Sequence, residues 1–244
     1  MRLKRVIDFV VALLGLIVSS PVLLLFMAAI FFQDFKSPLY LGQRVGQFGR
    51  PFKMYKLRSM VSNAASLGGV STATDDRRIT RVGAIVRRYK LDELMQLINV
   101  LNGSMSLVGP RPNVQIDTER YTSLEAKMLA VRPGITDFAS IVFSDEGEIL
   151  EGSEDPDLKY NQVIRPWKSR LALFYIKNRS LKVDATLILL TLLAIVSREK
   201  ALTQTSCLLQ SIGADAELVN IAKRKEKLVP MPPPGADVPV SSIC

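Results

Sequence analysis

Residues 6–32 read VIDFVVALLGLIVSSPVLLLFMAAIFF and decide the fold, because they form an almost continuous apolar run near the start of the chain. A helix that spans a bilayer needs about 20 apolar residues, and this run is long enough. A secretory signal peptide has a shorter apolar core and a small-residue cleavage site, and no convincing site of that kind is present. The run therefore predicts a membrane segment, with residues 1–35 as the anchor.

Pro21 stands in the middle of the apolar run, directly after Ser19 and Ser20. Proline lacks an amide hydrogen and clashes with the preceding turn, so we expect the helix to kink or break there. The two serine hydroxyls can donate to carbonyls that the proline leaves without a partner. Each half alone is too short to cross a bilayer. Ser20 and Pro21 are thus the predicted break of a helix-break-helix.

Positive charge lies on both flanks of the apolar run. The flanking residues are Arg2, Lys4 and Arg5 before it, and Lys36, Arg44 and Arg50 after it. Lys and Arg near a membrane segment favour the cytoplasmic side, so both flanks are predicted to be cytoplasmic. A re-entrant anchor, which enters and leaves the membrane on one face, satisfies both flanks. A kinked helix that crosses the bilayer once remains the alternative.

The composition narrows the function. The chain of 244 residues has a formal net charge of +9 and a pI near 9.7, which favours anionic partners such as phosphates, nucleic acid or acidic lipid. It contains no histidine, so a Ser-His-Asp triad, a Cys-His pair and a histidine-ligated zinc are excluded. Its two cysteines, Cys207 and Cys244, lie in the weakly patterned C-terminal part, which argues against a disulfide framework.

Two adjacent carboxylates, Asp92 and Glu93, open the segment 90–101, which reads KLDELMQLINVL. Its apolar spacing predicts a helix, and the buried stripe of that helix is expected to be Leu91, Leu94, Ile98 and Leu101. The two carboxylates fall outside this stripe, in the first turn. Acidic residues there complement the helix dipole without any catalytic role, so a structural interpretation competes with a catalytic one.

Basic side chains on both sides of the carboxylate pair favour catalysis. Arg87 and Arg88 lie upstream, where a guanidinium can hold a phosphate and keep a nearby carboxylate ionised. Downstream, residues 109–112 read GPRP, and the two prolines present Arg111 on a stiff, extended segment. Such an arginine is either a phosphate clamp or a solvated turn residue.

Residues 52–58 read FKMYKLR and alternate apolar with basic side chains. This pattern predicts a half-buried strand that presents Lys53, and Lys56 or Arg58, to a surface. An ordinary solvated strand face is the alternative to a binding surface.

Several ordered motifs match a known family. They are KRVID at 4–8, the Ser20-Pro21 pair, QRVG at 43–46, FKMYKLRSM at 52–60, LDEL at 91–94, SLVGPRP at 106–112 and RPGIT at 132–136. In this order they closely resemble the bacterial sugar transferases, that is, the monotopic phosphoglycosyl transferases. The resemblance covers residues 1–197 and stops before the C-terminal tail.

The resemblance implies a membrane-bound enzyme that transfers a phosphosugar from a UDP-sugar to polyprenyl (undecaprenyl) phosphate, with Mg²⁺ and release of UMP. The Asp of the family's pair is the nucleophile, so Asp92 is expected to form an acyl-phosphate intermediate. Glu93 is expected to handle a proton or, with Asp92, the metal. Lys56, Arg87 and Arg111 match family positions associated with phosphate binding.

Three positions depart from the commoner family pattern. Met95 stands where proline is frequent, Ser104 replaces an aspartate, and Asp137 replaces a glycine. None of them removes a proposed catalytic group. The change at Asp137, near the acidic residues 144–148, leaves the identity of the sugar open.

We therefore expect an α/β, mainly helical, membrane-associated domain. Residues 1–35 form the re-entrant membrane anchor, 36–198 the catalytic phosphoglycosyl transferase domain, and 199–244 a partly disordered tail with no assigned function. Within the catalytic domain, residues 167–179 and 187–196 are predicted helices that lie either in the core or at the membrane interface. The proline-rich residues 230–239 cannot be helical.

The expected location is the bacterial inner membrane, with the catalytic domain on the cytoplasmic face, where the enzyme would initiate exopolysaccharide, O-antigen or glycoprotein assembly. Expected partners are the UDP-sugar, polyprenyl phosphate and membrane lipid, and a homodimer is left open. No nucleic acid is expected, since interleaved aromatics and an arginine-rich recognition helix are not evident. The alternative is a non-enzymatic, membrane-anchored basic module for acidic lipid or nucleic acid, which would have no use for the Asp-Glu pair.

Overall fold

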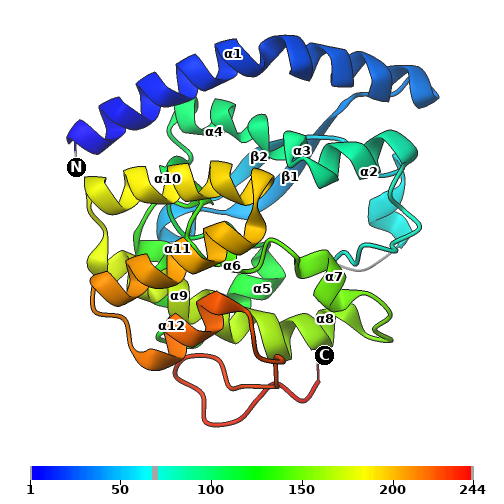
Figure 1. Cartoon of the computed structure of the whole chain (residues 1–244). Coiled ribbons are helices and arrows are strands. Elements are labelled where there is room, and N and C mark those ends of the chain that lie inside the picture. Colours follow the sequence, from blue (N-terminus) through cyan, green and yellow to red (C-terminus); the bar gives the residue numbers. More distant parts are fainter. Residues whose placement is uncertain (1, 68–70, 243–244) are drawn as a thin grey trace.

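The computed structural model describes residues 2–67 and 71–242, which form a mainly helical body with two small sheets (Figure 1). The helices are α1 (Arg2–Asp34), α2 (Arg81–Arg88), α3 (Leu91–Leu94), α4 (Gln96–Asn102), α5 (Gln115–Glu119), α6 (Phe138–Val142), α7 (Glu146–Leu150), α8 (Pro156–Lys159), α9 (Arg165–Asn178), α10 (Leu181–Val196), α11 (Arg198–Ser211) and α12 (Ala216–Lys223). The strands are β1 (Leu39–Val45), β2 (Pro51–Leu57), β3 (Ser106–Val108) and β4 (Gly134–Thr136). Short turns of other helix types are η1 (Gln47–Gly49), η2 (Ala64–Leu67), η3 (Glu125–Ala130) and η4 (Tyr160–Ile164). The expected mainly helical class is confirmed.

The helix α1 arcs over one side of the body and is long and apolar enough to cross a membrane (Figure 1). Pro21 lies inside this helix and the residues on both sides of it stay helical. Of the kink or break expected at Pro21, the break is therefore wrong: the helix continues through the proline and is curved along its length (Figure 1). Ser20 donates its hydroxyl to the carbonyl of Ile17 at 2.7 Å, which is the carbonyl that Pro21 cannot serve. Ser19 donates in the same way to Gly15 at 2.7 Å. Ser20 thus compensates for the proline, as predicted, and the helix persists.

The N-terminal end of α1 is fastened to the body by charged side chains. Lys4 pairs with Asp184 of α10 at 2.5 Å. Buried Asp8 accepts a hydrogen bond from Ser106 of β3 at 2.7 Å, and Arg5 donates to a carbonyl at the end of α4 at 3.0 Å. A carboxylate in an apolar helix is costly unless it is paired, so this network accounts for Asp8 within the apolar run.

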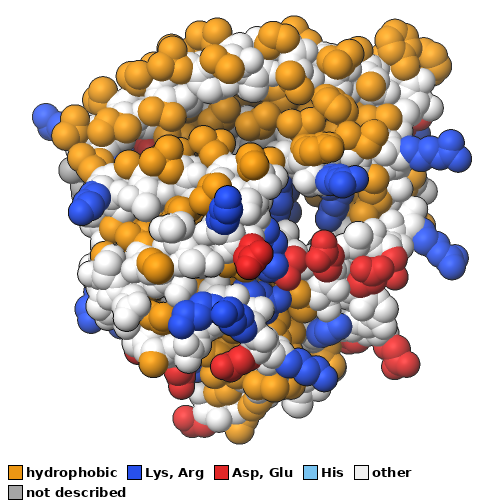
Figure 2. Space-filling model, viewed as in Figure 1, with side chains coloured by type: hydrophobic (Ala, Val, Ile, Leu, Met, Phe, Trp, Pro, Cys, Tyr) orange, Lys and Arg blue, Asp and Glu red, His pale blue; other side chains and the backbone are white. Residues whose placement is uncertain are grey.

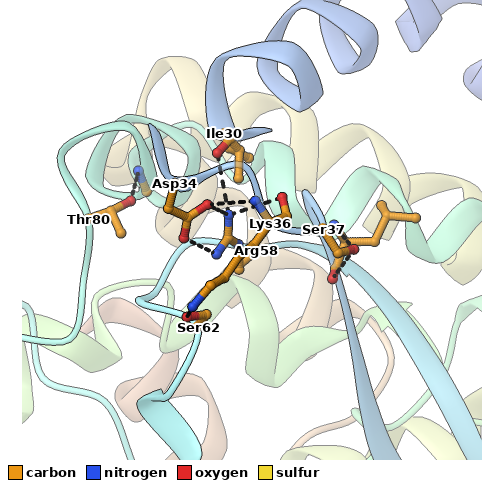
Figure 3. A network of polar contacts seen from close by, with 9 residues as sticks. Ile30, Asp34, Lys36, Ser37, Arg58, Ser62 and Thr80 are labelled. Atoms are coloured by element: carbon orange, nitrogen blue, oxygen red, sulfur yellow. Dashed lines mark hydrogen bonds and ion pairs between the residues drawn. The ribbon is translucent and has the colours of Figure 1, made fainter. Parts of the chain in front are cut away.

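The C-terminal end of α1 is fastened to the same body (Figure 3). Arg58, the residue after β2, donates to both carboxylate oxygens of Asp34 at 2.5 and 2.6 Å, and to the carbonyl of Ile30 at 3.3 Å. Just beyond the helix, Lys36 donates to Ser62 at 2.8 Å. Arg58 is therefore buried as an anchor for α1, so the strand does not present it to a surface. Both ends of α1 are bound to one globular body.

The two sheets position the segments that carry basic residues. The predicted strand at 52–58 is confirmed as β2, which pairs antiparallel with β1, whereas β3 and β4 pair parallel. Beyond β3, Gly109 and Gly134 touch so closely that a Cβ on Gly134 would lie 2.1 Å from the nitrogen of Gly109. The amide of Gly134 donates to Pro110 at 2.9 Å. Only glycine fits this contact, which fixes the place of the segment that carries Arg111.

The helix predicted at 90–101 is present as α3 and α4, but its predicted buried stripe is wrong. The stripe residues are half-buried, whereas Asp92, Gln96 and Val100 are buried on another side of the helix. Three of the stripe residues belong to a cluster that packs α3 and α4 against α1, with members that include Leu91, Leu94, Ile98, Met95, Leu23 and Ile30. The periodicity identified an apolar face correctly, but this face rests on the membrane-type helix and the opposite face holds polar groups.

The helices α9 and α10 differ in their surroundings. Trp167 of α9 is 8% exposed and belongs to the main core, so α9 is a core helix. In contrast, α10 buries one side and exposes large apolar side chains on the other, namely Leu181, Leu189, Leu192, Ile195 and Val196. Hydrophobic side chains also cover α1 and the surface below it in the view of Figure 2. An apolar surface of this kind suits contact with a membrane.

Residues 199–223 are an ordered part of the body rather than a detached tail. They form α11 and α12, whose apolar side chains complete the main core. The segment 230–239 has no regular structure, as predicted, yet it is held by hydrogen bonds. The amide of Met231 donates to Gln162 at 3.0 Å, and the Gln162 side chain donates to Val240 at 2.8 Å. The sequence pattern missed this packing.

Candidate active site

Hydrogen bonds between α4 and β2 build the site. Asn99 of α4 accepts a hydrogen bond from the amide of Tyr55 at 2.9 Å and donates to the carbonyl of Lys53 at 2.8 Å. These bonds fix β2 against the helix pair, which brings Lys56 of that strand next to the carboxylates of α3. The buried side-chain amide of Asn99 thus bonds backbone groups of β2 as a neighbouring strand would, and this holds β2 in one position along α4.

The carboxylates meet cations from two other parts of the chain. The Nζ of Lys56 lies 3.8 Å from Asp92 Oδ2 and 3.8 Å from Glu93 Oε1. Arg111 donates through two nitrogens to both carboxylate oxygens of Glu93, one of them at 3.2 Å. Four of the five predicted site residues are therefore brought together from β2, α3 and the segment after β3.

Arg87, the fifth predicted residue, lies at the edge of this group. It belongs to the last turn of α2, one loop away from α3. Its positive charge acts on Asp92 and lowers the pKa of that carboxyl, against the larger effect of burial, which raises it. Arg88 instead stacks on the ring of Tyr89 at 5.8 Å. Of these two arginines, Arg87 is therefore the one whose charge stabilises the ionised form of Asp92.

The two adjacent carboxylates have opposite electrostatic surroundings. Burial raises the pKa of Asp92, and the charge of Lys56 opposes this only in part. Burial would also raise the pKa of Glu93, but the charges of Arg111 and Lys56 outweigh it and hold the pKa of Glu93 far below its ordinary value. Glu93 is therefore a fixed anion, whereas Asp92 is a desolvated and loosely paired carboxylate.

Sequence reasoning missed Gln96, which lies one helical turn after Asp92 on the same side of the helix. It is 1% exposed, and within residues 2–67 and 71–242 neither atom of its side-chain amide has a hydrogen-bond partner. Unpartnered buried amides are rare in proteins. The signal in the sequence was the spacing of four residues from a proposed nucleophile, at a position that lies off the predicted apolar stripe.

A second group that sequence reasoning missed lies beside the carboxylates in the segment 143–147. The carbonyl of Ser144 accepts a hydrogen bond at 3.4 Å from Lys90, the residue that precedes α3. Glu146 pairs with Lys168 of α9, and its negative charge helps to raise the pKa of Arg111, for which Glu93 is the main cause. Asp137, by contrast, caps α6 by accepting hydrogen bonds from Ser140.

The donor set fits a magnesium ion only in part. In the described part of the chain, no three His, Cys, Asp or Glu side chains come close enough to hold a metal. Both oxygens of Glu93 are bonded to Arg111, whereas the carboxylate of Asp92, among the residues that the structure describes, has the longer contact with Lys56 as its only ion pair. Mg²⁺ is commonly held by one or two carboxylates together with substrate phosphates. Asp92 can supply one such oxygen, and Glu93 as the second ligand stays a prediction.

The surface around the site is hollowed and charged. Figure 2 shows Lys and Arg side chains within and around a hollow below α3, with acidic side chains on its lower side. A cavity of about 300 Å³ lies elsewhere, between α9 and α12, and contains none of the predicted site residues. The charged hollow is therefore the better candidate for binding an anionic substrate.

The fold and the site define a membrane-associated protein with a carboxylate and cation centre suited to phosphate chemistry. A family model described as bacterial sugar transferase matches residues 1–198. The chain belongs to this bacterial sugar transferase family. This membership counts against the alternative of a non-enzymatic basic module.

Individual relatives agree with the family. A Bacillus subtilis protein, provisionally named an undecaprenyl-phosphate N-acetylgalactosaminyl 1-phosphate transferase, is 44% identical over 121 residues, which are 50% of this chain and 68% of that protein. The exopolysaccharide production protein ExoY of Sinorhizobium fredii is 40% identical over 148 residues (54% and 66%). The UDP-glucose:undecaprenyl-phosphate glucose-1-phosphate transferase of Escherichia coli is 40% identical over 172 residues (68% and 36%). The chain thus spans two thirds of some relatives and about a third of another.

Proposed function

We propose that the protein transfers a sugar 1-phosphate from a UDP-sugar to a polyprenyl phosphate such as undecaprenyl phosphate, releases UMP, and so initiates bacterial glycan assembly. The observation that carries the proposal is the unequal carboxylate pair: Glu93 is held by Arg111, and Asp92 is desolvated beside Lys56. The acceptor is supported by relatives whose names specify undecaprenyl phosphate, and the donor by the Escherichia coli relative, whose name specifies UDP-glucose.

In the proposed first step, an Asp92 carboxylate oxygen attacks the phosphorus that bears the sugar. The bond from this phosphorus to the bridging oxygen breaks, and UMP leaves with the bonding electrons. In the second step, an oxygen of polyprenyl phosphate attacks the same phosphorus and the acyl–phosphorus bond breaks. This regenerates the carboxylate and forms a polyprenyl diphosphate sugar.

The cationic side chains have distinct roles in this mechanism. Lys56 and Arg111 reduce the repulsion between an anionic nucleophile and an anionic diphosphate, and Arg87 adds positive charge at the edge. Glu93 keeps the Arg111 guanidinium in one orientation through its two bonds. Bound Mg²⁺ would add a further positive charge next to the substrate phosphates.

We also propose that α1 is re-entrant and that the catalytic body lies on the cytoplasmic face of the inner membrane. Lys4 at one end of α1 and Asp34 at the other are both paired with the same body. A body on one side of a bilayer cannot hold both ends of a helix that crosses it. With 33 residues, α1 is about 50 Å long, more than the bilayer core requires. A curved helix whose middle enters the membrane while both ends stay at one face is consistent with both observations (Figure 1).

The deciding experiment omits the lipid acceptor. Purified protein in detergent or nanodiscs is incubated with Mg²⁺ and each of a panel of UDP-sugars, and UMP release and intact-protein mass are measured. A covalent intermediate predicts one UMP per active molecule and a mass increase of one phosphosugar, mapped to Asp92. UMP release that waits for acceptor, without an adduct, would indicate direct attack by the lipid phosphate instead.

Asp92→Asn is the matched control, because it is nearly isosteric but a far poorer nucleophile. An adduct of equal yield in this variant, or one mapped to another residue, would show that Asp92 is not the nucleophile. No UMP release with any UDP-sugar, with or without polyprenyl phosphate, would contradict the proposed reaction itself.

A further inference from the structure

Arg224 connects the C-terminal part of the chain to the edge of the site. It follows α12, which lies beyond the residues matched by the family model. Its guanidinium bonds to the Asp145 carboxylate at 3.1 Å, and the ring of Phe143 lies 5.1 Å from its central carbon. Arg198, at the start of α11, pairs with the same carboxylate at 2.8 Å. One acidic residue is thus held by two arginines.

The Arg224 contact is sheltered from solvent. The Arg224 side chain is 10% exposed and that of Asp145 is 13% exposed, whereas that of Arg198 is 38% exposed. Ion pairs of this kind are less screened by water and salt than surface pairs. Arg224 also adopts a left-handed backbone conformation (φ 52°), where glycine is the usual residue at a helix end. A left-handed backbone is unfavourable for an arginine, and here its side chain makes the contact with Asp145 that a glycine could not make.

The segment held by Arg224 leads directly to the catalytic helix. Ser144, next to Asp145, accepts the hydrogen bond from Lys90, and Lys90 also has a left-handed backbone (φ 57°) immediately before α3. On the other side, the carbonyl of Gly147 accepts a hydrogen bond from Thr74 at 3.1 Å. The segment 143–147 therefore forms a wall of the site: it contacts Arg224 at the end of α12 on one side and Lys90, just before α3, on the other.

We propose that Arg224 is a positioning residue: through Asp145 it fixes the segment 143–147 against Lys90, so that residues 199–224 are a functional part of the active site. The proposal rests on the proposed function for its kinetic consequence, but not for its structural one. Arg198 still neutralises Asp145 when Arg224 is changed, so a variant at Arg224 leaves no buried carboxylate unpaired.

The test compares Arg224→Gln, Arg224→Lys, Asp145→Asn and the double variant Arg224→Gln/Asp145→Asn. For Arg224→Gln we expect a loss of about 10- to 100-fold in kcat for UMP release, since a displaced wall misplaces the reacting groups. Arg224→Lys should recover part of the loss because it keeps the charge beside Asp145 but not the planar guanidinium that lies over the Phe143 ring. The double variant should lose no more than Asp145→Asn alone, because the contact that Arg224→Gln breaks is already lost when Asp145 is changed.

The matched control is Arg170→Gln, which removes the 3.3 Å pair between α9 and Glu217 of α12 but leaves Arg224 in place. It should keep normal kcat. Hydrogen exchange in the full-length protein supplies a readout that needs no turnover: amides of 143–147 and of Lys90 should exchange faster in Arg224→Gln, with α1 unchanged. Normal kcat with unchanged exchange, additive losses in the double variant, or an equal loss in Arg170→Gln would each overturn the proposal. If the wild type shows no turnover with any UDP-sugar, the proposed function fails, and the exchange data alone decide whether Arg224 holds the segment.

Discussion

The guanidinium of Arg111 faces the carboxylate of Glu93 and donates to both of its oxygens, although the two residues lie 18 positions apart in the sequence. The neighbouring Asp92 has no such fork: its nearest cation is the Lys56 ammonium at 3.8 Å, and Arg87 acts on it from a greater distance through its charge. Two adjacent acidic residues thus divide into one that holds an arginine and one that is left available. This division underlies the following predictions.

The two carboxylates should affect stability in opposite directions at neutral pH. Asp92→Asn is expected to raise the melting temperature, because the folded protein raises the pKa of Asp92 and so disfavours its charged form. Glu93→Gln is expected to lower the free energy of unfolding by about 1–3 kcal/mol, since a buried, charge-assisted pair loses one partner. Thermal unfolding of the two variants beside the wild type measures both effects. Equal shifts of one sign would contradict the assignment.

The same prediction has a pH dependence with a definite sign. For Asp92, whose pKa is raised on folding, the wild type loses stability as the pH rises from 3.8 through the folded pKa, so the advantage of Asp92→Asn should shrink on acidification. For Glu93, whose pKa is lowered, the stabilisation is complete above 4.5 and is lost as the pH falls below that value. Melting curves at several pH values between neutral and acid separate the two.

Arg111→Lys should lower kcat by about 100-fold with little change in the melting temperature, because lysine keeps the charge but cannot form the fork to Glu93 and a phosphate together. Arg88→Lys is the matched control, since Arg88 lies over the ring of Tyr89 and is not one of the three positions that the family resemblance associates with phosphate binding. Near-normal turnover of Arg111→Lys would show that the guanidinium fork serves the contact with Glu93 and not a substrate phosphate.

Gln96→Met should leave stability unchanged or raise it by about 1 kcal/mol, because it replaces a buried amide that lacks partners by an apolar side chain of similar size. A marked fall in the melting temperature would show that the amide is satisfied in the folded protein, contrary to the structure. Kinetics on the same variant then separate two roles. If the Gln96→Met protein is stable but slow, the amide contributes to binding of the substrate. If it is stable and fully active, the position contributes only to packing.

Labelling of single cysteines tests the topology of α1 in a background in which Cys207 and Cys244 are replaced by serine. Cysteines at positions 2 and 50 should both react only from the cytoplasmic side, because both flanks are basic and both ends of α1 are bound to one body. A cysteine at Val18, which is 79% exposed in the absence of lipid, should resist a polar reagent. Reaction of position 2 or position 50 from the periplasmic side would contradict the re-entrant arrangement.

Local patterns predicted much of this fold. The extent of the apolar helix, the strand at β2 and the helix that begins near Asp92 follow from periodicity alone, and the role of Ser20 follows from the chemistry of proline. The buried stripe failed for a physical reason: Leu91, Leu94 and Ile98 meet α1, so an apolar face is not the same as a core face in a membrane-associated protein. The spacing of apolar residues along a helix identifies its apolar face but does not reveal which element that face packs against.

Long-range contacts account for the rest of what the sequence could not predict. The bond from Arg111 to Glu93 depends on the touching backbones at Gly109 and Gly134, whose partners are distant in the sequence. Packing of α11 and α12 likewise depends on a core assembled from the whole chain, so weak local patterning suggested a tail. The family resemblance supplied residue roles, whereas only the three-dimensional structure distinguishes the surroundings of Asp92 from those of Glu93.

The packing of α3 on α1 has a consequence for how Asp92, the nucleophile of the proposed mechanism, would meet a lipid phosphate. Leu91 and Leu94 lie on either side of Asp92 in the sequence and belong to one apolar cluster with Leu23 and Ile30 of α1. For a helix seated in lipid, this contact sets the height of Asp92 relative to the headgroups, so a phosphate at that level is met without extraction of its hydrocarbon chain. Bilayer thickness tilts or lifts membrane-seated helices. In the proposed arrangement we therefore expect acyl-chain length in the surrounding membrane to change the position of Asp92 through a few leucine and isoleucine contacts.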